Sequence, residues 1–170
     1  MLPLPTTTIR EALQAIEDGF RAHFGDAIRQ YGAYEPWDPV EDEPEPELKT
    51  PAWLFELESI DPDDAESHAP GRLAIRCTFN AHAVLSILTL ELQIALPELA
   101  AAGIAVVRKT ETSPLAPPLN GNRWGLGEAL GPPEAVSARP AEFRPGLHGH
   151  DAWAVAWEQL VYLPESLPTD

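Results

Sequence analysis

The chain has few of the residues on which several classes of protein depend. Its 170 residues include a single cysteine, Cys77, so an internal disulfide is excluded and a cysteine-based zinc cluster has no basis. Only 11 residues are lysine or arginine, against 27 aspartates and glutamates, and the net charge is −16. Because DNA-binding proteins neutralise phosphates with basic patches, we do not expect this chain to hold DNA in that way.

Long apolar runs are also missing. The most apolar stretch, residues 83–107, is interrupted by Glu91, Gln93, Pro97 and Glu98, so it predicts no membrane span. The first residues lack the basic end and apolar core of a signal peptide, and we expect a protein made in the cytoplasm. The acidic excess could repel DNA, mimic it or attract a basic partner, but a surface that only keeps the protein soluble is the simplest interpretation.

The residues that are present predict one globular domain spanning residues 1–170. Apolar residues make up 44% of the chain, which is normal for a folded protein, while 19 prolines and 11 glycines predict short elements with long connections. A helix is predicted over residues 8–27, with Thr8 and Glu11 forming a capping box and Gly25 near its end. Its apolar stripe consists of Ile9, Leu13, Ile16, Phe20 and Phe24.

Residues 32–51 are predicted to form an acidic, proline-rich loop. The prolines forbid regular structure and the carboxylates repel one another, which favours a mobile, solvated loop over an arm that binds a partner. Trp37 is the residue in this loop that could anchor it against a surface.

Residues 52–87 predict a β-hairpin whose second strand has strict alternation. One set of side chains, which includes Cys77, is apolar, and the other is polar. We expect Cys77 to be an unreactive core residue, and His82 and His68 to be ordinary surface groups. The apolar set is Leu73, Ile75, Cys77, Phe79 and Ala81; the polar set is Arg72, Arg76, Thr78, Asn80 and His82.

The second half of the chain completes an α+β order of elements. Residues 88–107 fit both a strand and a helix, and their length and alanines favour a helix that Pro97 would kink or divide. A loop with a short extended piece at "RWGLG" is predicted next, and residues 133–163 contain two strands, the first an edge strand because of Pro140. We therefore predict a single, mostly antiparallel four-stranded sheet with two helices packed on one face and long proline-rich loops.

The last strand, "HDAWAVAWEQLVYL", has two different faces. In strand geometry Trp153, Val155, Trp157 and Gln159 share one face, and a row of alanines lies on the other. Because alanines let a helix approach closely, we predict that the helices cover the alanine row, which leaves the tryptophan row for another chain to cover. The alternative stays open: the tryptophans point into the core and the alanines face outward.

Patterns for catalysis or cofactor binding are weak in this sequence. His148 and His150 beside Asp151 form a partial metal set, but solvated loop histidines are the favoured interpretation. No serine has a nucleophile elbow around it, and "GNRWGLG" lacks both the phosphate-loop lysine and the dinucleotide spacing. We expect no enzymatic activity, no metal and no cofactor.

Three pieces of the chain together resemble one family. The early amphipathic helix, "GNRWG" after the second helix and the terminal "WAVAWEQLVYL" look like the tail-terminator or tail-completion proteins of long-tailed phages and phage-derived particles such as pyocins. The likeness covers residues 8–163. The resemblance implies a structural virion protein of the tail neck, made in the host cytoplasm, that forms a ring of usually six subunits on the head-proximal end of the tail tube.

The resemblance also implies the partners and the residues to test. The ring stops polymerisation of the tube protein and provides the docking surface for a head-completion or collar protein, while DNA passes through without specific binding. By this resemblance and the strand pattern, the expected interface residues are Trp153, Val155, Trp157, Gln159, Asn122, Arg123, Trp124 and Trp37. Two other hypotheses are an acidic module that captures a basic protein and a small hydrolase or metal-dependent enzyme that uses His148, His150 and Asp151.

Overall fold

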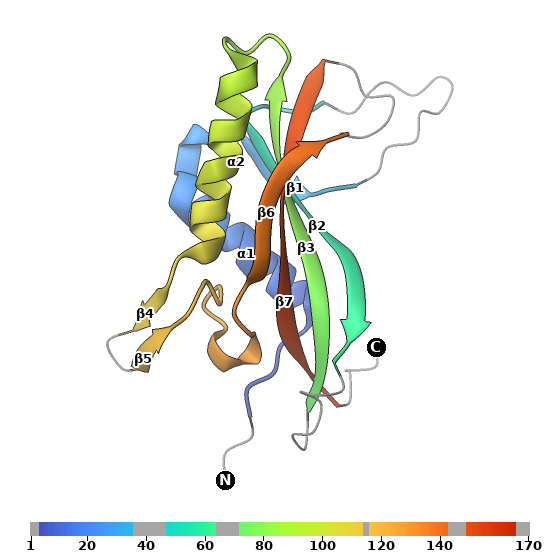
Figure 1. Cartoon of the computed structure of the whole chain (residues 1–170), viewed down its shortest axis with the longest axis vertical. Coiled ribbons are helices and arrows are strands. Elements are labelled where there is room, and N and C mark those ends of the chain that lie inside the picture. The colour runs from blue at the N-terminus through green and yellow to red at the C-terminus, as the bar shows by residue number, and fades with distance from the viewer. Residues whose placement is uncertain (1–3, 36–46, 64–71, 114–115, 143–148, 166–170) are drawn as a thin grey trace.

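The fold is α+β, with two helices and a five-stranded mixed sheet (Figure 1). The computed structural model describes residues 4–35, 47–63, 72–113, 116–142 and 149–165. The strand order is β1-β2-β3-β7-β6, and two further strands form a separate small sheet. The elements are α1 (Ile9–Phe24), β1 (Gln30–Ala33), β2 (Ala52–Pro62), β3 (Arg72–Ser86), α2 (Leu92–Arg108), β4 (Glu111–Ser113), β5 (Ala116–Leu119), β6 (Glu134–Ala141) and β7 (His150–Pro164).

The first helix follows the sequence prediction closely. The hydroxyl of Thr8 accepts a hydrogen bond from the backbone N–H of Glu11 at 3.1 Å, as expected of an N-cap. The Glu11 carboxylate accepts from the Thr7 hydroxyl at 3.2 Å and not from the Thr8 backbone N–H, so only the N-cap half of the predicted capping box is formed. Gly25 ends α1 with a positive φ of 54°, and residues Gly25–Ala27 continue as a short 3₁₀ turn, so the α-helix ends three residues earlier than predicted.

The sheet differs from the prediction by one strand. The hairpin of β2 and β3 and the edge position of β6 are confirmed, but β1 pairs with β2 in parallel and adds a fifth strand. This strand has only four residues and directly precedes the proline-rich stretch, so its pattern was too short to distinguish from a loop. Most of the predicted acidic loop, residues 36–46 with Trp37, lies outside the described residues.

Two further predictions about the second half are corrected. Helix α2 begins at Leu92, not at residue 88, and Pro97 lies within it without dividing it. Residues 111–119 contain the two short strands β4 and β5, whereas "RWGLG" is a turn followed by the 3₁₀ helix η2 (Gly127–Ala129). The start of α2 was difficult to place from the sequence, because the leucines of 88–96 fit two periods at once.

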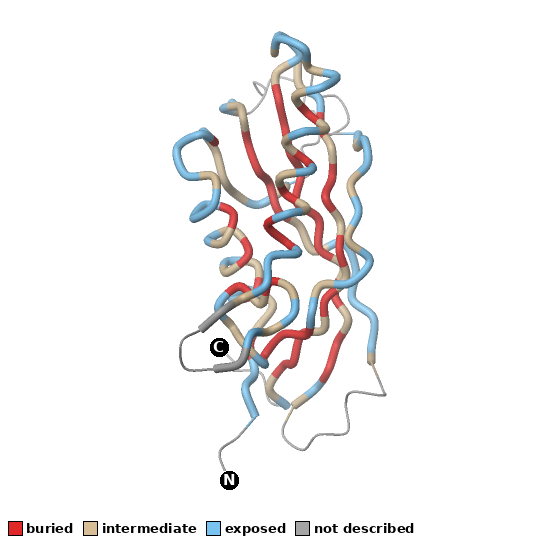
Figure 2. Tube along the Cα trace, turned by 60° about the vertical axis from the view of Figure 1, so that its left-hand side comes forward, coloured by how far each residue is buried: buried red, intermediate tan, exposed pale blue. Residues whose placement is uncertain are grey.

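The prediction about the two faces of β7 is wrong. Both helices cover the tryptophan row: Trp157 is 1% exposed, and a Cβ added to Gly103 of α2 would lie 3.1 Å from Val155 Cγ2. Trp153 is half-buried against the same core. The alanine row lies on the opposite face, where Ala152 packs with Ala52, Leu54 and Val84. Figure 2 shows buried residues concentrated along the central strands.

The physical reason for this orientation is the size of the side chains. The helices bring their own aromatic and aliphatic groups to the sheet, and the large indoles fill the remaining space between the layers. Phe20 of α1, for example, lies with its ring centroid 4.9 Å from Trp53 and 5.8 Å from Trp124. Glycines in the helices allow the close approach that alanines on the sheet were predicted to allow, because Gly19 and Gly103 each face a tryptophan ring.

Candidate functional site

A buried polar cluster occupies the middle of the core and contains four of the predicted interface residues, Asn122, Trp124, Trp157 and Gln159. Gln159 is 0% exposed, and its Oε1 accepts hydrogen bonds from Trp124 Nε1 and Trp157 Nε1, each at 3.1 Å. Its Nε2 donates to the carbonyl oxygens of Asn122 at 3.0 Å and Gly131 at 2.8 Å. All the hydrogen-bonding capacity of this amide is therefore used inside the chain.

The "GNRWG" segment is held by the same cluster. Asn122 Nδ2 donates to the carbonyl of Val106 near the end of α2 at 3.0 Å, and its Oδ1 accepts from the backbone N–H of Trp124 at 2.8 Å. Trp124 adopts a positive φ of 55°, which few residues other than glycine tolerate, so these bonds hold it in a strained conformation. The motif joins the end of α2 to β7.

The residues expected to contact another chain are mostly buried in this one, which corrects the prediction that they are exposed. Trp157, Gln159, Asn122 and Trp124 are buried within their own chain, and Val155 is 0% exposed. A neighbouring subunit would find little of their surface to contact. Trp153 and Arg123 are half-buried, and Trp37 lies outside the described residues.

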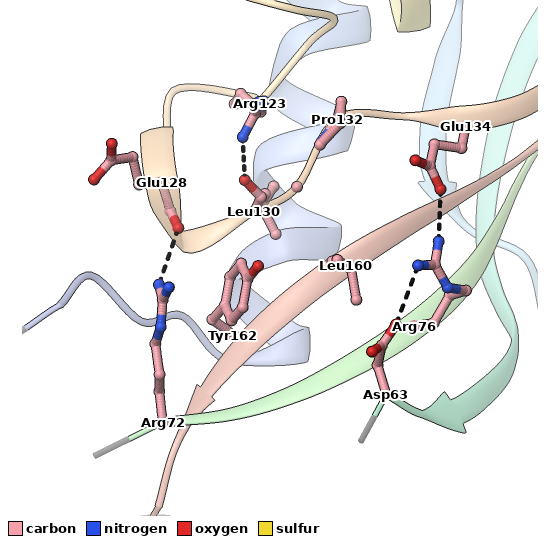
Figure 3. A pocket seen from close by; sticks show the side chains of 11 residues that line it. Asp63, Arg72, Arg76, Arg123, Glu128, Leu130, Pro132, Glu134, Leu160 and Tyr162 are labelled. Carbon is pink, nitrogen blue, oxygen red and sulfur yellow. Dashed lines mark hydrogen bonds and ion pairs between the residues drawn. The ribbon is translucent and has the colours of Figure 1, made fainter. Parts of the chain in front are cut away.

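A pocket of about 620 Å³ lies between the strands β3 and β7 and the segment before β6 (Figure 3). We call it the arginine pocket, because three guanidinium groups line it together with three carboxylates and part of the β7 surface. Residues of β3 and β7 form one wall and the segment before β6 forms the other. The lining residues are Asp63, Arg72, Arg76, Arg123, Glu128, Leu130, Gly131, Pro132, Glu134, Leu160 and Tyr162.

The arginines of this pocket bind groups of the same chain. Arg76 donates to Asp63 at 3.1 Å and to Glu134 at 2.7 Å; burial lowers the pKa of Arg76, but these two carboxylates outweigh it and the pKa is raised. Arg72 donates from Nη1 to the carbonyls of Pro5 and Glu128, each at 3.3 Å, and its guanidinium lies 3.8 Å from the centroid of the Tyr162 ring. The guanidinium of Arg123 donates to the carbonyl of Leu130.

The arginines of the pocket therefore connect segments that are distant in the sequence. They tie β3 to the residues after β2, to the N-terminal segment and to the turn before β6, as the dashed lines in Figure 3 show for the side chains drawn. Because three carboxylates accompany the three guanidinium groups, the lining has no net charge with which to attract an anion. Among the described residues that line it there is no cysteine, serine or histidine to act as a nucleophile or base.

The histidines are placed differently from the sequence prediction. His82 is 5% exposed: its Nε2 lies 2.7 Å from Glu56 Oε1, and its ring stacks on Tyr34 at 4.3 Å between centroids. It is therefore a buried, partnered residue and not a surface group. His68 and His148 lie outside the described residues, and within the described chain no group of three or more metal-ligating side chains comes together around His150 and Asp151.

Cys77 is in the core, as predicted. It is fully buried beneath the helices, and burial raises the pKa of its thiol to about 11. The protonated thiol is a weak nucleophile, so this cysteine packs as a small apolar side chain.

An apolar loop between β3 and α2 is the main feature that the sequence patterns did not predict. Leu88 and Leu90 are 90% and 87% exposed, and Ile87 and Ile94 are more than half exposed. We call these four residues the apolar loop, although Ile94 lies in the first turn of α2. The apolar loop projects beyond the strand ends at the top of Figures 1 and 2. The helix predicted over residues 88–107 included both leucines, whereas α2 begins only at Leu92.

The apolar loop has a fixed conformation. The backbone N–H groups of Leu88 and Thr89 donate to the side chain and the carbonyl of Ser86, at 3.2 and 3.0 Å. Ile87 donates from its backbone to Gly149 at 3.0 Å, which ties the loop to the start of β7. Glu91 then turns the chain into α2 with a positive φ of 52°. The leucines are thus held in water by a hydrogen-bonded turn, which is unusual for the surface of a monomer.

A second apolar surface lies between α1 and the sheet edge. This groove, which we call the α1 groove, has a volume of about 420 Å³. Its walls come from the first half of α1, from β1 and from Phe55 of β2, and polar side chains of α1 border it. The lining residues are Ile9, Arg10, Leu13, Gln14, Glu17, Gly32, Ala33 and Phe55.

Comparison with known proteins gives no family for this chain. No protein-family model matches the sequence, and no curated protein matches it significantly. Among the described residues, no helix is both long and apolar enough to cross a membrane.

Proposed function

We propose that the chain is a structural subunit of the tail-terminator type. Copies of it would form a ring, with six subunits as the expected number, on the head-proximal end of a phage or phage-like tail tube. The ring would stop tube polymerisation and provide the docking surface for a head-completion or collar protein. Its place would be the neck of the virion tail, after synthesis in the host cytoplasm.

The apolar loop is the observation that carries this proposal. Two leucines held almost entirely in water, with two half-exposed isoleucines beside them, favour burial against another protein. The buried tryptophans no longer support a ring, so the support moves from β7 to the loop before α2. The α+β order of elements fits the resemblance on which the ring was expected.

The charge of the chain suits such a role. With a net charge of −16, subunits repel one another at long range, so stable association must come from buried apolar contacts. An acidic ring would also let DNA pass through its centre without binding to the walls.

The function can be tested on tail tubes. We expect the purified protein to bind one end of tubes assembled from the tube protein of the same genome, and to stop their growth when added during assembly. Negative-stain microscopy would measure tube lengths and the presence of terminal rings. Tubes that grow to the same length with and without the protein, and that carry no rings, would contradict the proposal.

The second candidate is an acidic module that captures a basic protein, and the net charge favours it. It predicts binding to a basic partner that weakens steeply with salt, because exposed charge pairs are screened. Substitutions in the apolar loop would leave such binding unchanged, which separates this candidate from the ring protein.

A further inference from the structure

We infer that the apolar loop of one copy docks into the α1 groove of the next copy, so that subunits are joined head to tail. This inference rests on the proposed ring and names its subunit contact. The two surfaces belong to different parts of the molecule: the loop lies between β3 and α2, and the groove lies between α1 and β1. A contact between two different surfaces of identical chains is heterologous, and it closes into a ring when the rotation allows.

The sizes of the two surfaces match. An enclosed cavity of about 150 Å³ accommodates a benzene molecule, so a groove of about 420 Å³ has room for two leucine side chains. Ile9, Leu13 and Phe55 offer the apolar wall that these side chains would contact. Gly32 and Ala33 keep the β1 side of the groove low, because neither carries a large side chain.

The charges beside the two surfaces are complementary. Glu91 directly follows Leu90, is exposed, and makes no ion pair with a described residue. Arg10 lines the groove, is exposed, and likewise has no carboxylate partner within the described parts of the chain. Glu17 also lines the groove, but it forms an ion pair with Arg21 at 3.4 Å. Among the described residues Arg10 is therefore the unpaired charge of the groove, and it favours an acidic partner segment such as the loop with Glu91.

The first test uses variants of the two surfaces, measured by light scattering coupled to size-exclusion chromatography. We expect the wild-type chain to be a closed oligomer, and Leu88→Ser with Leu90→Ser to weaken association at least ~100-fold, because two buried leucines are lost. Ala33→Glu should do the same by filling the groove with a carboxylate beside Glu91. All three positions are exposed, so the variants should unfold at the same temperature as the wild type.

A matched control removes two other exposed apolar side chains. Ile60 and Leu73 are 47% and 46% exposed on β2 and β3, away from the loop and the groove. The variant Ile60→Ser with Leu73→Ser should keep the wild-type oligomer. Loss of the oligomer in this control would contradict the inference, because association would then depend on exposed apolar area in general.

Mixing the variants tests the head-to-tail geometry. The loop variant retains an intact α1 groove, and the groove variant retains an intact apolar loop. In an equimolar mixture the loop of the groove variant can therefore dock into the groove of the loop variant, but no further contact can form. We expect this mixture to form a 1:1 dimer and no ring, whereas each variant alone stays monomeric. A mixture that remains monomeric would overturn the heterologous contact.

Charge exchange tests the pairing of Arg10 with Glu91. Each single reversal, Arg10→Glu or Glu91→Arg, should weaken association about 3- to 10-fold, and the double reversal should restore it. If each single reversal weakened association and the double reversal weakened it further, the pairing of Arg10 with Glu91 would be contradicted.

The outcomes separate this inference from the proposed function. A wild-type ring that survives the loop and groove variants would overturn the loop–groove contact and leave the ring function standing. A wild-type monomer that caps tubes and loses this binding in the loop variant would assign the loop to the tube protein and overturn self-docking. A monomer that neither assembles nor binds tubes would overturn both.

Discussion

Gln159 has a different role from the one its position in the sequence indicates. It follows Trp157 by two residues and was predicted to share an exposed face with it, yet one amide oxygen receives both indole N–H groups. A glutamine in this position satisfies polar groups that a hydrophobic residue would leave without partners. The indoles can therefore be buried without the cost of unpaired N–H groups.

Replacing Gln159 tests the importance of this cluster. Gln159→Leu should lower the free energy of unfolding by about 3 kcal/mol or more, because two indole N–H groups and two backbone carbonyls lose their partners. Urea unfolding at low protein concentration would measure the change. The control Gln14→Leu, on the exposed face of α1, should change it by no more than about 0.5 kcal/mol, and a similarly small effect at Gln159 would contradict the role assigned to the cluster.

Cys77 gives a prediction with a defined pH dependence. Its thiol pKa is raised from 9.0 to about 11 by burial, so the thiol should resist alkylation in the native protein at pH 8 and react when the chain unfolds. The stabilising effect of the neutral thiol is fully present below pH 9 and is lost as the pH rises through about 11. Native-state alkylation at the rate of the unfolded chain would contradict the buried placement.

At the level of the elements, the helices approach the sheet through glycines. Gly103 of α2 lies against Trp53, and Gly19 of α1 lies against Trp124. A Cβ added at either glycine would lie 2.6 Å from the facing tryptophan, which is too close for unstrained packing. These two glycines therefore set the distance between the helices and the tryptophan face of the sheet.

Gly103→Ala should destabilise the fold by about 1–3 kcal/mol, because the added methyl group has no space against a well-packed core. Gly32→Ala is a matched control, since its Cβ would lie 4.0 Å from Leu54 Cδ2, an ordinary contact. Thermal unfolding of both variants would test this. If Gly103→Ala unfolded at the same temperature as Gly32→Ala and the wild type, α2 could move away from the sheet without cost, and the role of Gly103 would be contradicted.

Much of the fold could be predicted from the sequence where one period dominated. The capping residues of α1, the alternation of β3 and the edge position of β6 all followed from local patterns. The orientation of β7 could not be chosen in this way, because both of its rows can be buried. Glu158 offered a signal that was missed: it shares the alanine face, and a carboxylate there is costly to place under helices.

The candidate site was harder to predict than the fold. A leucine-rich run at helical spacing predicts a buried helix. The structure shows instead that α2 begins at Leu92, so that Leu88 and Leu90 precede the helix and are exposed. The arginine pocket was also hidden in the sequence, because it joins residues as distant as Arg72, Arg123 and Tyr162. Such long-range pairings depend on strand register, which single-sequence patterns specify only weakly.

At the scale of the whole molecule, the described surface has one polar region, the arginine pocket, and two apolar regions, the apolar loop and the α1 groove. The arginines of the arginine pocket bind groups of the same chain, whereas no described residue covers much of the apolar loop, whose two leucines are 90% and 87% exposed. The α1 groove is likewise open among the described residues. Repulsion between acidic subunits should make assembly dependent on salt: moderate salt screens the repulsion and should strengthen association, in contrast to a contact made by charges alone. Sedimentation at two ionic strengths would measure this, and dissociation of the oligomer by salt would contradict it.

The most direct test of the central claim is the mass of the wild-type protein in solution, measured by light scattering over a wide range of concentrations. We predict one closed oligomer of fixed size that does not grow as the concentration rises. A chain that stays monomeric at every concentration, both alone and with tail tubes, would contradict the claim.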